Sequence, residues 1–201
     1  MKKIFFPIVL LINLTAWSQT ETDFKKEITT AKTSYSANKL EETHFALQQA
    51  LSEIDITIGK EILKMLPPKM GEAAINPKED HVTSNLGMVG ATVSRSYGTP
   101  TEKVKFELIS NSPLVTTLNA LLNAPLVGGM MRDENSKTIK VKGYKARLER
   151  SVGEAENEYN YTIQLPFGNA LLTLTVYKTT ESEATKLMES LPLQAIAKLV
   201  Q

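Results

Sequence analysis

The chain has 201 residues, with 23 lysines and arginines against 22 aspartates and glutamates, so its formal net charge is +1. Such a balance gives no argument for binding nucleic acid or an anionic membrane through overall charge. The apolar fraction of 42% argues against disorder, and the absence of cysteine excludes disulfides, thiol nucleophiles and cysteine–zinc sites.

The first 18 residues have the pattern of a secretory signal peptide. Two lysines precede an apolar run over 4–14, and Ala16 and Ser18 are the small residues expected before a cut after Ser18. The run is too short for a membrane anchor, which needs about 20 apolar residues. We therefore expect an exported bacterial protein, periplasmic or extracellular, with no integral membrane segment once the leader is removed.

Residues 19–66 are expected to form an antiparallel helical hairpin. In its first part, apolar residues recur at spacings of four and three, which places them on one stripe of a helix. These residues are Phe24, Ile28, Ala31 and Tyr35. A second helix is expected from about Leu40 to Leu66, where two prolines follow. Gly59 inside it costs about 1 kcal/mol relative to alanine and is expected to mark a close approach to the sheet.

The hairpin is loosely similar to a single tetratricopeptide-like helix pair. The residues that carry this similarity are Ala31, Tyr35, Leu40, Leu47, Ala50 and Leu51. Thr43 stands where such pairs usually have alanine, and no second copy follows. Because one such unit cannot make a repeat array, the hairpin is expected to serve either as packing scaffold or as a surface for a partner.

Residues 67–85 are expected to form a linker or long loop, because they carry Pro, Gly, Asn and charged residues without apolar periodicity. An α+β domain is expected over 86–201. Its first two strands are predicted near 89–93 and 104–108, followed by a helix after Pro113. A third strand is predicted over 139–148, with a β-bulge at Gly143 where the parity of the apolar positions changes.

The strongest strand signal lies between Tyr159 and Val176. Apolar and polar residues alternate in two runs, separated by a turn at 166–169, which predicts an antiparallel hairpin. Thr180 and Glu183 have the spacing of a capping box at the start of a C-terminal helix. The predicted fold class is α+β, with an antiparallel sheet of about five strands, the order β-β-α-β-β-β-α, and helices packed on one face.

Motifs for catalysis are missing from the sequence. It contains no Gly-x-Ser-x-Gly elbow, no P-loop and no dinucleotide fingerprint, so neither an enzyme nor a cofactor is predicted. Glu79, Asp80 and His81 are adjacent, but three neighbouring loop residues do not easily converge on one ion, and no metal site is predicted. Asp55 and the other aspartates are expected to be solvated or to cap helices. A hydrolase with a dispersed carboxylate site stays as an alternative.

Basic residues gather on predicted strands in a pattern that could bind an anionic polymer or an acidic partner. The residues of this predicted face are Lys103, Lys105, Lys140, Lys142, Lys145 and Arg147. They would share one face only if their strands are neighbours. The alternative is an ordinary solvated sheet face. No aromatic residues interleave with them as single-stranded nucleic acid would require, so no nucleic acid is expected as partner.

An irregular apolar stretch over 121–131 is the second candidate contact surface. It combines two glycines and paired methionines, and methionine adapts to surfaces of varied shape. The candidate contact residues are Leu121, Leu126, Met130 and Met131. The alternative is a crossover buried under the helices.

The leading functional hypothesis is a non-enzymatic envelope protein that binds a protein partner through the hairpin or through residues 121–131. The alternative is a carrier for a small apolar or lipid-like ligand held between sheet and helices. The cavity that this alternative requires would be lined by Leu114, Leu118, Met130, Phe106 and Leu174.

Overall fold

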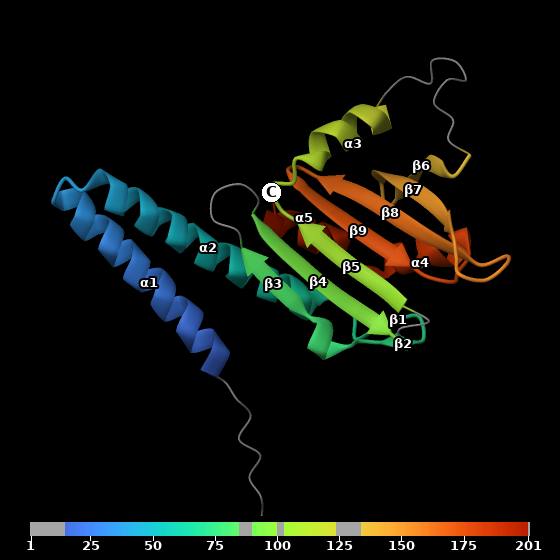
Figure 1. The fold of residues 1–201 in the computed structure, drawn as a ribbon, viewed down its shortest axis with the longest axis horizontal. Helices are drawn as coiled ribbons and strands as arrows, with labels where there is room; N and C mark the ends of the chain where they lie inside the picture. The colour runs from blue at the N-terminus through green and yellow to red at the C-terminus, as the bar shows by residue number, and fades with distance from the viewer. Residues whose placement is uncertain (1–14, 85–89, 100–102, 124–133, 201) are drawn as a thin grey trace, which may run out of the picture. The chain divides into compact units, whose positions relative to one another are not determined.

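The structure is a computed structural model that describes residues 15–84, 90–99, 103–123 and 134–200, with side chains described from residue 23 onward (Figure 1). The chain divides into two compact units, Met1–Glu53 and Ile54–Gln201, and each is described by itself. Within the described ranges, no helix combines the length and apolar character needed to span a bilayer.

The first unit contains the predicted helical hairpin, which is confirmed. Its helices are α1, Thr15–Ser36, and the beginning of α2, Leu40–Met65. Asn38 in the connection has φ 57°, a left-handed conformation that asparagine tolerates better than most residues. The side chains buried in this unit are all small: Ala31, Ser34, Thr43, Ala46 and Ala50. Small residues let two helix backbones approach closely, so the contact between the helices leaves the large apolar residues outside.

The second unit is built on a seven-stranded antiparallel sheet in the order β3-β4-β5-β9-β8-β7-β6. The α+β class is confirmed, and the sheet is larger than the five strands predicted. The strands are β3 His81–Ser84, β4 Ala91–Gly98, β5 Lys103–Ile109, β6 Ser136–Val141, β7 Tyr144–Val152, β8 Tyr159–Phe167 and β9 Ala170–Val176. The predicted hairpin between Tyr159 and Val176 corresponds to β8 and β9, which turn at Gly168 and Asn169.

The extra strand in the second half of the sheet comes from the segment around Gly143. The prediction of one strand with a β-bulge is wrong, because β6 and β7 are separate antiparallel strands with Val141 opposite Tyr144. Lys142 and Gly143 form the two-residue turn, with φ values of 46° and 89°. A two-residue turn with both φ values positive matches the twist of the strands it joins. It also shifts the parity of the apolar positions, as a bulge would.

The segment 67–85, predicted to be linker or loop, carries short regular elements. They are the paired strands β1 Lys69–Met70 and β2 Ala73–Ala74, the 3-10 helix η1 Pro77–Glu79, and the edge strand β3. β3 has only four residues and pairs with β4. Four residues are too few to show clear alternation, which is why the sequence pattern does not reveal this strand.

Helices cover both faces of the sheet, although most of the core lies on one. Figure 1 shows α4, Glu181–Ser190, and α5, Leu193–Val200, behind the sheet, where they join the last turns of α2 over the main core. Thr180 caps α4 as predicted, since its side chain accepts a hydrogen bond from the backbone N–H of Glu183. The exception is α3, Leu114–Asn123, which packs on Leu171 of β9. The next residue of that strand, Leu172, points into the main core. Successive strand residues point to opposite faces, so α3 lies on the other face.

Candidate functional site

The helical hairpin of the first unit exposes a set of large apolar side chains. Five of them are Ile28 and Tyr35 on α1 and Leu40, Leu47 and Leu51 on α2, between 41% and 68% exposed. We call these five residues the hairpin face. A sixth, Phe45 of α2, is 57% exposed and points to a different side of the helix. A purely structural hairpin would place such residues in a core, whereas within this unit they lie outside the contact between the helices.

The five residues lie on one side of the hairpin. Successive residues of an α-helix turn by roughly 100°, so on each helix the residues of the hairpin face are rotated by roughly 80° to 90° from the buried ones, in the same sense. The two helices run in opposite directions, and equal rotations on antiparallel partners point to the same side. Ile28 and Tyr35, and likewise Leu40 and Leu47, are separated by seven residues, which keeps each pair in line along its helix.

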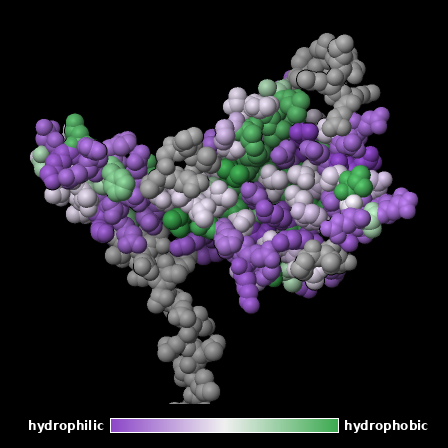
Figure 2. All heavy atoms as spheres, in the orientation of Figure 1, coloured by the Kyte–Doolittle hydropathy of each residue, from purple (hydrophilic) through white to green (hydrophobic). Residues whose placement is uncertain are grey.

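Only one of the four contact residues predicted over 121–131 is described. Leu121 lies on α3 and is 43% exposed. Leu114, two turns earlier, is also exposed, and Figure 2 shows hydrophobic surface over this helix. Leu126, Met130 and Met131 lie outside the described residues.

The structure does not bring the six predicted basic residues into one patch. β9 and β8 lie between β5, which carries Lys103 and Lys105, and β7, which carries Lys145 and Arg147. Three of the six are in ion pairs, which are Lys103–Glu79 at 2.6 Å, Lys105–Glu107 at 3.0 Å and Arg147–Glu149 at 3.3 Å.

Two further lysines of that set are held by backbone or amide oxygens. Lys142 donates to the carbonyl of Leu191 at 3.0 Å, and Lys145 donates to Oδ1 of Asn123 at 2.7 Å. Lys140 stands opposite Lys145 in the β6–β7 ladder. Anion binding by the smaller group on β6 and β7 stays a prediction.

The adjacent acids before β3 serve the packing of the sheet. Arg95 of β4 is 8% exposed and binds Asp80 in a two-pronged ion pair, with Nε–Oδ1 at 2.9 Å and Nη2–Oδ2 at 2.6 Å. Its Nη1 donates to the carbonyl of Leu63 at 2.7 Å. Neighbouring Glu79 pairs with Lys103, and the pKa of this exposed glutamate is lowered chiefly by that hydrogen bond. In the part of the chain that the structure describes, no three His, Asp or Glu side chains are grouped to hold a metal ion.

The cavity predicted between sheet and helices does not form from the residues named for it. Leu118, a residue of α3, packs on one face of the sheet, whereas Phe106 and Leu174 are buried in the main core on the other. Leu114 is exposed, and Met130 lies outside the described residues. These residues do not line one cavity, because α3 packs on the face of the sheet opposite to the one from which Phe106 and Leu174 project.

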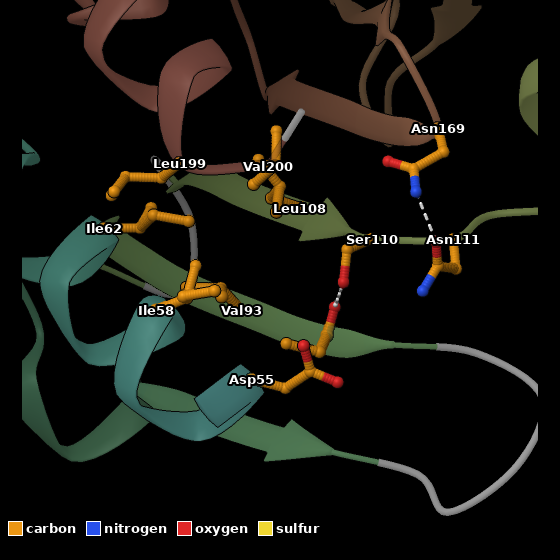
Figure 3. A pocket seen from close by; sticks show the side chains of 11 residues that line it. Asp55, Ile58, Ile62, Val93, Leu108, Ser110, Asn111, Asn169, Leu199 and Val200 are labelled. Atoms are coloured by element: carbon orange, nitrogen blue, oxygen red, sulfur yellow. Dashed lines mark hydrogen bonds between the residues drawn. The ribbon is translucent and has the colours of Figure 1, made fainter. Parts of the chain in front are cut away.

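A different cavity of about 180 Å³ lies between α2, α5 and one end of the sheet (Figure 3). Its lining residues are Asp55, Ile58, Ile62, Ala91, Val93, Leu108, Ser110, Asn111, Asn169, Leu199 and Val200. In Figure 3 the aliphatic side chains of α2 and α5 lie on one side, and Ser110, Asn111 and Asn169 lie on the other. An apolar wall with a few polar groups is typical of small-molecule sites.

Among the described residues that line this cavity, Asp55 is the one with a charged side chain. Among the described residues its hydrogen-bond partner is Ser84, whose hydroxyl donates to Oδ2 at 3.4 Å. Burial raises the pKa of Asp55 above its ordinary value, and the Ser84 hydrogen bond offsets only part of this effect. Asp55 is therefore half-buried beside the aliphatic lining and does not stand in open solvent. Its position three residues before Ile58 and seven before Ile62, on the stripe that faces the core, was a readable signal.

The fold and these surfaces define an α+β protein with a helical hairpin and a small cavity beside the sheet. Comparison with known proteins finds no matching family model, no similar curated protein and no similar solved structure.

Proposed function

We propose that this chain is a non-enzymatic, exported protein of the bacterial envelope that binds a protein partner through the hairpin face. The carrying observation is the exposure of five large apolar side chains on one side of a helix pair whose fully buried side chains are all small. Clustered exposed apolar residues mark interaction surfaces, because leaving them in water is unfavourable. Each such side chain stabilises a complex by about 1 to 2 kcal/mol when a partner covers it.

The partner chemistry follows from the spacing of the exposed residues. Seven-residue intervals on two antiparallel helices present ridges of the kind that another helix or helix pair packs against. A partner with an amphipathic helix therefore suits the hairpin face better than an extended peptide, which would need a free strand edge.

Export is supported by the sequence pattern of the first 18 residues. A cut after Ser18 would fall in the first turn of α1, which begins at Thr15, and would leave the hairpin face intact. Mass spectrometry of the protein purified from its host is expected to give a chain that begins at Gln19. An N-terminal peptide beginning at Met1 would overturn the export proposal.

The test of partner binding uses two variants of α1 in the full chain. Tyr35→Glu places a charge on the hairpin face, whereas Thr33→Glu places the same charge on an exposed position of the opposite side. In mild detergent extracts of the host envelope, the wild type and Thr33→Glu are expected to migrate as a larger complex on native gels, and Tyr35→Glu as the free chain. Free wild type, or equal behaviour of both variants, would overturn the proposal.

A second candidate function is a small-ligand carrier, which the cavity beside Asp55 favours. Its volume of about 180 Å³ lies below the roughly 300 to 1,000 Å³ of typical ligand pockets, so it suits a very small ligand and not a lipid. A hydrolase is not proposed, because Asp55 supplies the one carboxylate among the described residues that line this cavity. Acid–base hydrolysis by paired carboxylates needs two.

A further inference from the structure

The cavity between α2, α5 and the end of the sheet has features that define a ligand class. We propose that it binds a small primary alkylamine, with the ammonium group paired to Asp55 and the alkyl chain against the aliphatic wall. This inference deepens the second candidate function and is independent of the hairpin face.

The volume sets the size of the ligand. An apolar cavity of about 150 Å³ holds benzene, so a cavity of about 180 Å³ accepts a ligand of about six to eight non-hydrogen atoms. The wall offers Ile58, Ile62 and Leu199, together with Val93, Leu108 and Val200. These side chains provide apolar contact and no hydrogen-bonding group, so the body of the ligand must be hydrocarbon.

The charge of the ligand follows from Asp55. This carboxylate stands at the edge of the apolar wall, and its single described hydrogen bond, from Ser84, is long. A partly buried carboxylate without a cationic partner is unfavourable, and an ammonium group would supply both the opposite charge and strong hydrogen bonds. A ligand with a carboxylate group would be repelled by Asp55, and a divalent cation would find too few carboxylate oxygens to coordinate it.

The polar rim complements an ammonium group and is already ordered. Ser110 donates to the carbonyl of Ala91 at 3.3 Å, and the Asn169 amide donates to Oδ1 of Asn111 (Figure 3). The backbone N–H of Ser112 donates to the carbonyl of Asn169 at 2.9 Å, which ties the β8–β9 turn to the end of β5. The Ser110 hydroxyl oxygen can still accept a hydrogen bond, and an ammonium group has three donors and no acceptor. A rim fixed beforehand lowers the entropy cost of binding.

The experiment titrates the full-length mature protein with hexylamine, 1-hexanol and hexanoate at neutral pH, followed by NMR shifts of cavity residues. Hexylamine is expected to bind at least tenfold more tightly than hexanol, and hexanoate is expected not to bind. Asp55→Asn should reduce hexylamine affinity to that of hexanol and leave hexanol unchanged. Asp23→Asn, the same chemical change on α1, should alter neither.

A variant that fills the cavity, together with the comparison of the two ligands, distinguishes failure of the amine inference from failure of the carrier function. Leu199→Trp is expected to abolish binding of both hexylamine and hexanol while the thermal unfolding transition persists. If hexanol binds as tightly as hexylamine, the amine inference fails and the carrier function survives. If neither compound shifts a cavity residue, or Leu199→Trp binds as before, both the amine inference and the carrier function fail.

Discussion

Gly59 of α2 lies so close to Val82 of β3 that a Cβ atom at position 59 would overlap the Val82 side chain, and it would also stand 3.0 Å from Cγ2 of Val93. The expected close approach of α2 to the sheet at this glycine is therefore confirmed. Glycine lowers helix stability by about 1 kcal/mol relative to alanine, and here that cost permits direct packing of the helix backbone on two valines.

Gly59→Ala is expected to destabilise the fold by about 1 to 3 kcal/mol, because overpacking outweighs the gain in helix propensity. Chemical denaturation measures the change. The control Ser52→Ala, in the same helix, should be neutral or slightly stabilising. A Gly59→Ala protein as stable as the wild type would show that α2 does not pack on β3 and β4 in this way.

Arg95→Met is expected to cost about 3 to 5 kcal/mol, since it leaves the carboxylate of Asp80 partly buried and unpaired. The double variant with Asp80→Asn should recover part of that loss. The control Arg147→Met breaks the more exposed pair with Glu149 and should cost about 0 to 1 kcal/mol. Equal losses for the two arginines, measured by urea unfolding, would contradict the structural role given to Arg95.

Gly143→Ala tests the turn between β6 and β7. Nothing lies within 4 Å of an added Cβ, so the only cost is the positive φ of 89°. We expect a loss of about 1 kcal/mol, and a smaller loss for Gly143→Asn, because asparagine tolerates left-handed backbone. Thermal unfolding of both variants checks this order, and an unchanged melting temperature for Gly143→Ala would exclude the turn.

Asp55→Asn is expected to raise the melting temperature at pH 7. Burial raises the pKa of Asp55 in the folded protein, so the folded state holds this proton more tightly than the unfolded state. Ionisation therefore destabilises the fold above the raised pKa, and the effect disappears as the pH falls toward the ordinary range of aspartate, about 4. The gain in melting temperature from Asp55→Asn should therefore shrink as the pH is lowered from the raised pKa of Asp55 to about 4. A gain independent of pH, or one equal to that of the exposed control Glu41→Gln, would contradict the burial of Asp55.

Local patterns predicted the elements whose evidence lies within a few residues. The β8–β9 hairpin followed from alternation on both sides of Gly168 and Asn169, and the cap of α4 followed from the spacing of Thr180 and Glu183. The parity change at Gly143 was detected but assigned to a bulge, because a bulge and a two-residue turn shift the apolar positions alike. Lysine at 142 is not a typical residue for such a turn, so composition did not separate the two.

Long-range pairing and the functional surfaces were harder to predict. Periodicity reports which residues share a face of one strand, but not that β9 and β8 separate β5 from β7, so the basic residues could not be assigned to separate regions. The burial of Arg95 was readable from its position between Val93 and Tyr97 in the strand alternation, yet its partner Asp80 belongs to a segment taken for a loop. The exposure of the hairpin face could not be read from spacing, since a core stripe has the same period.

The most direct test of the proposed function is site-specific photocrosslinking in the living host. A photoreactive residue at Leu51, on the hairpin face, is expected to give a discrete higher-mass adduct with one protein, and Tyr35→Glu should abolish it. The same residue at Thr33, on the opposite side, should give none. Absence of any adduct from Leu51, or equal adducts from both positions, would contradict partner binding through the hairpin face.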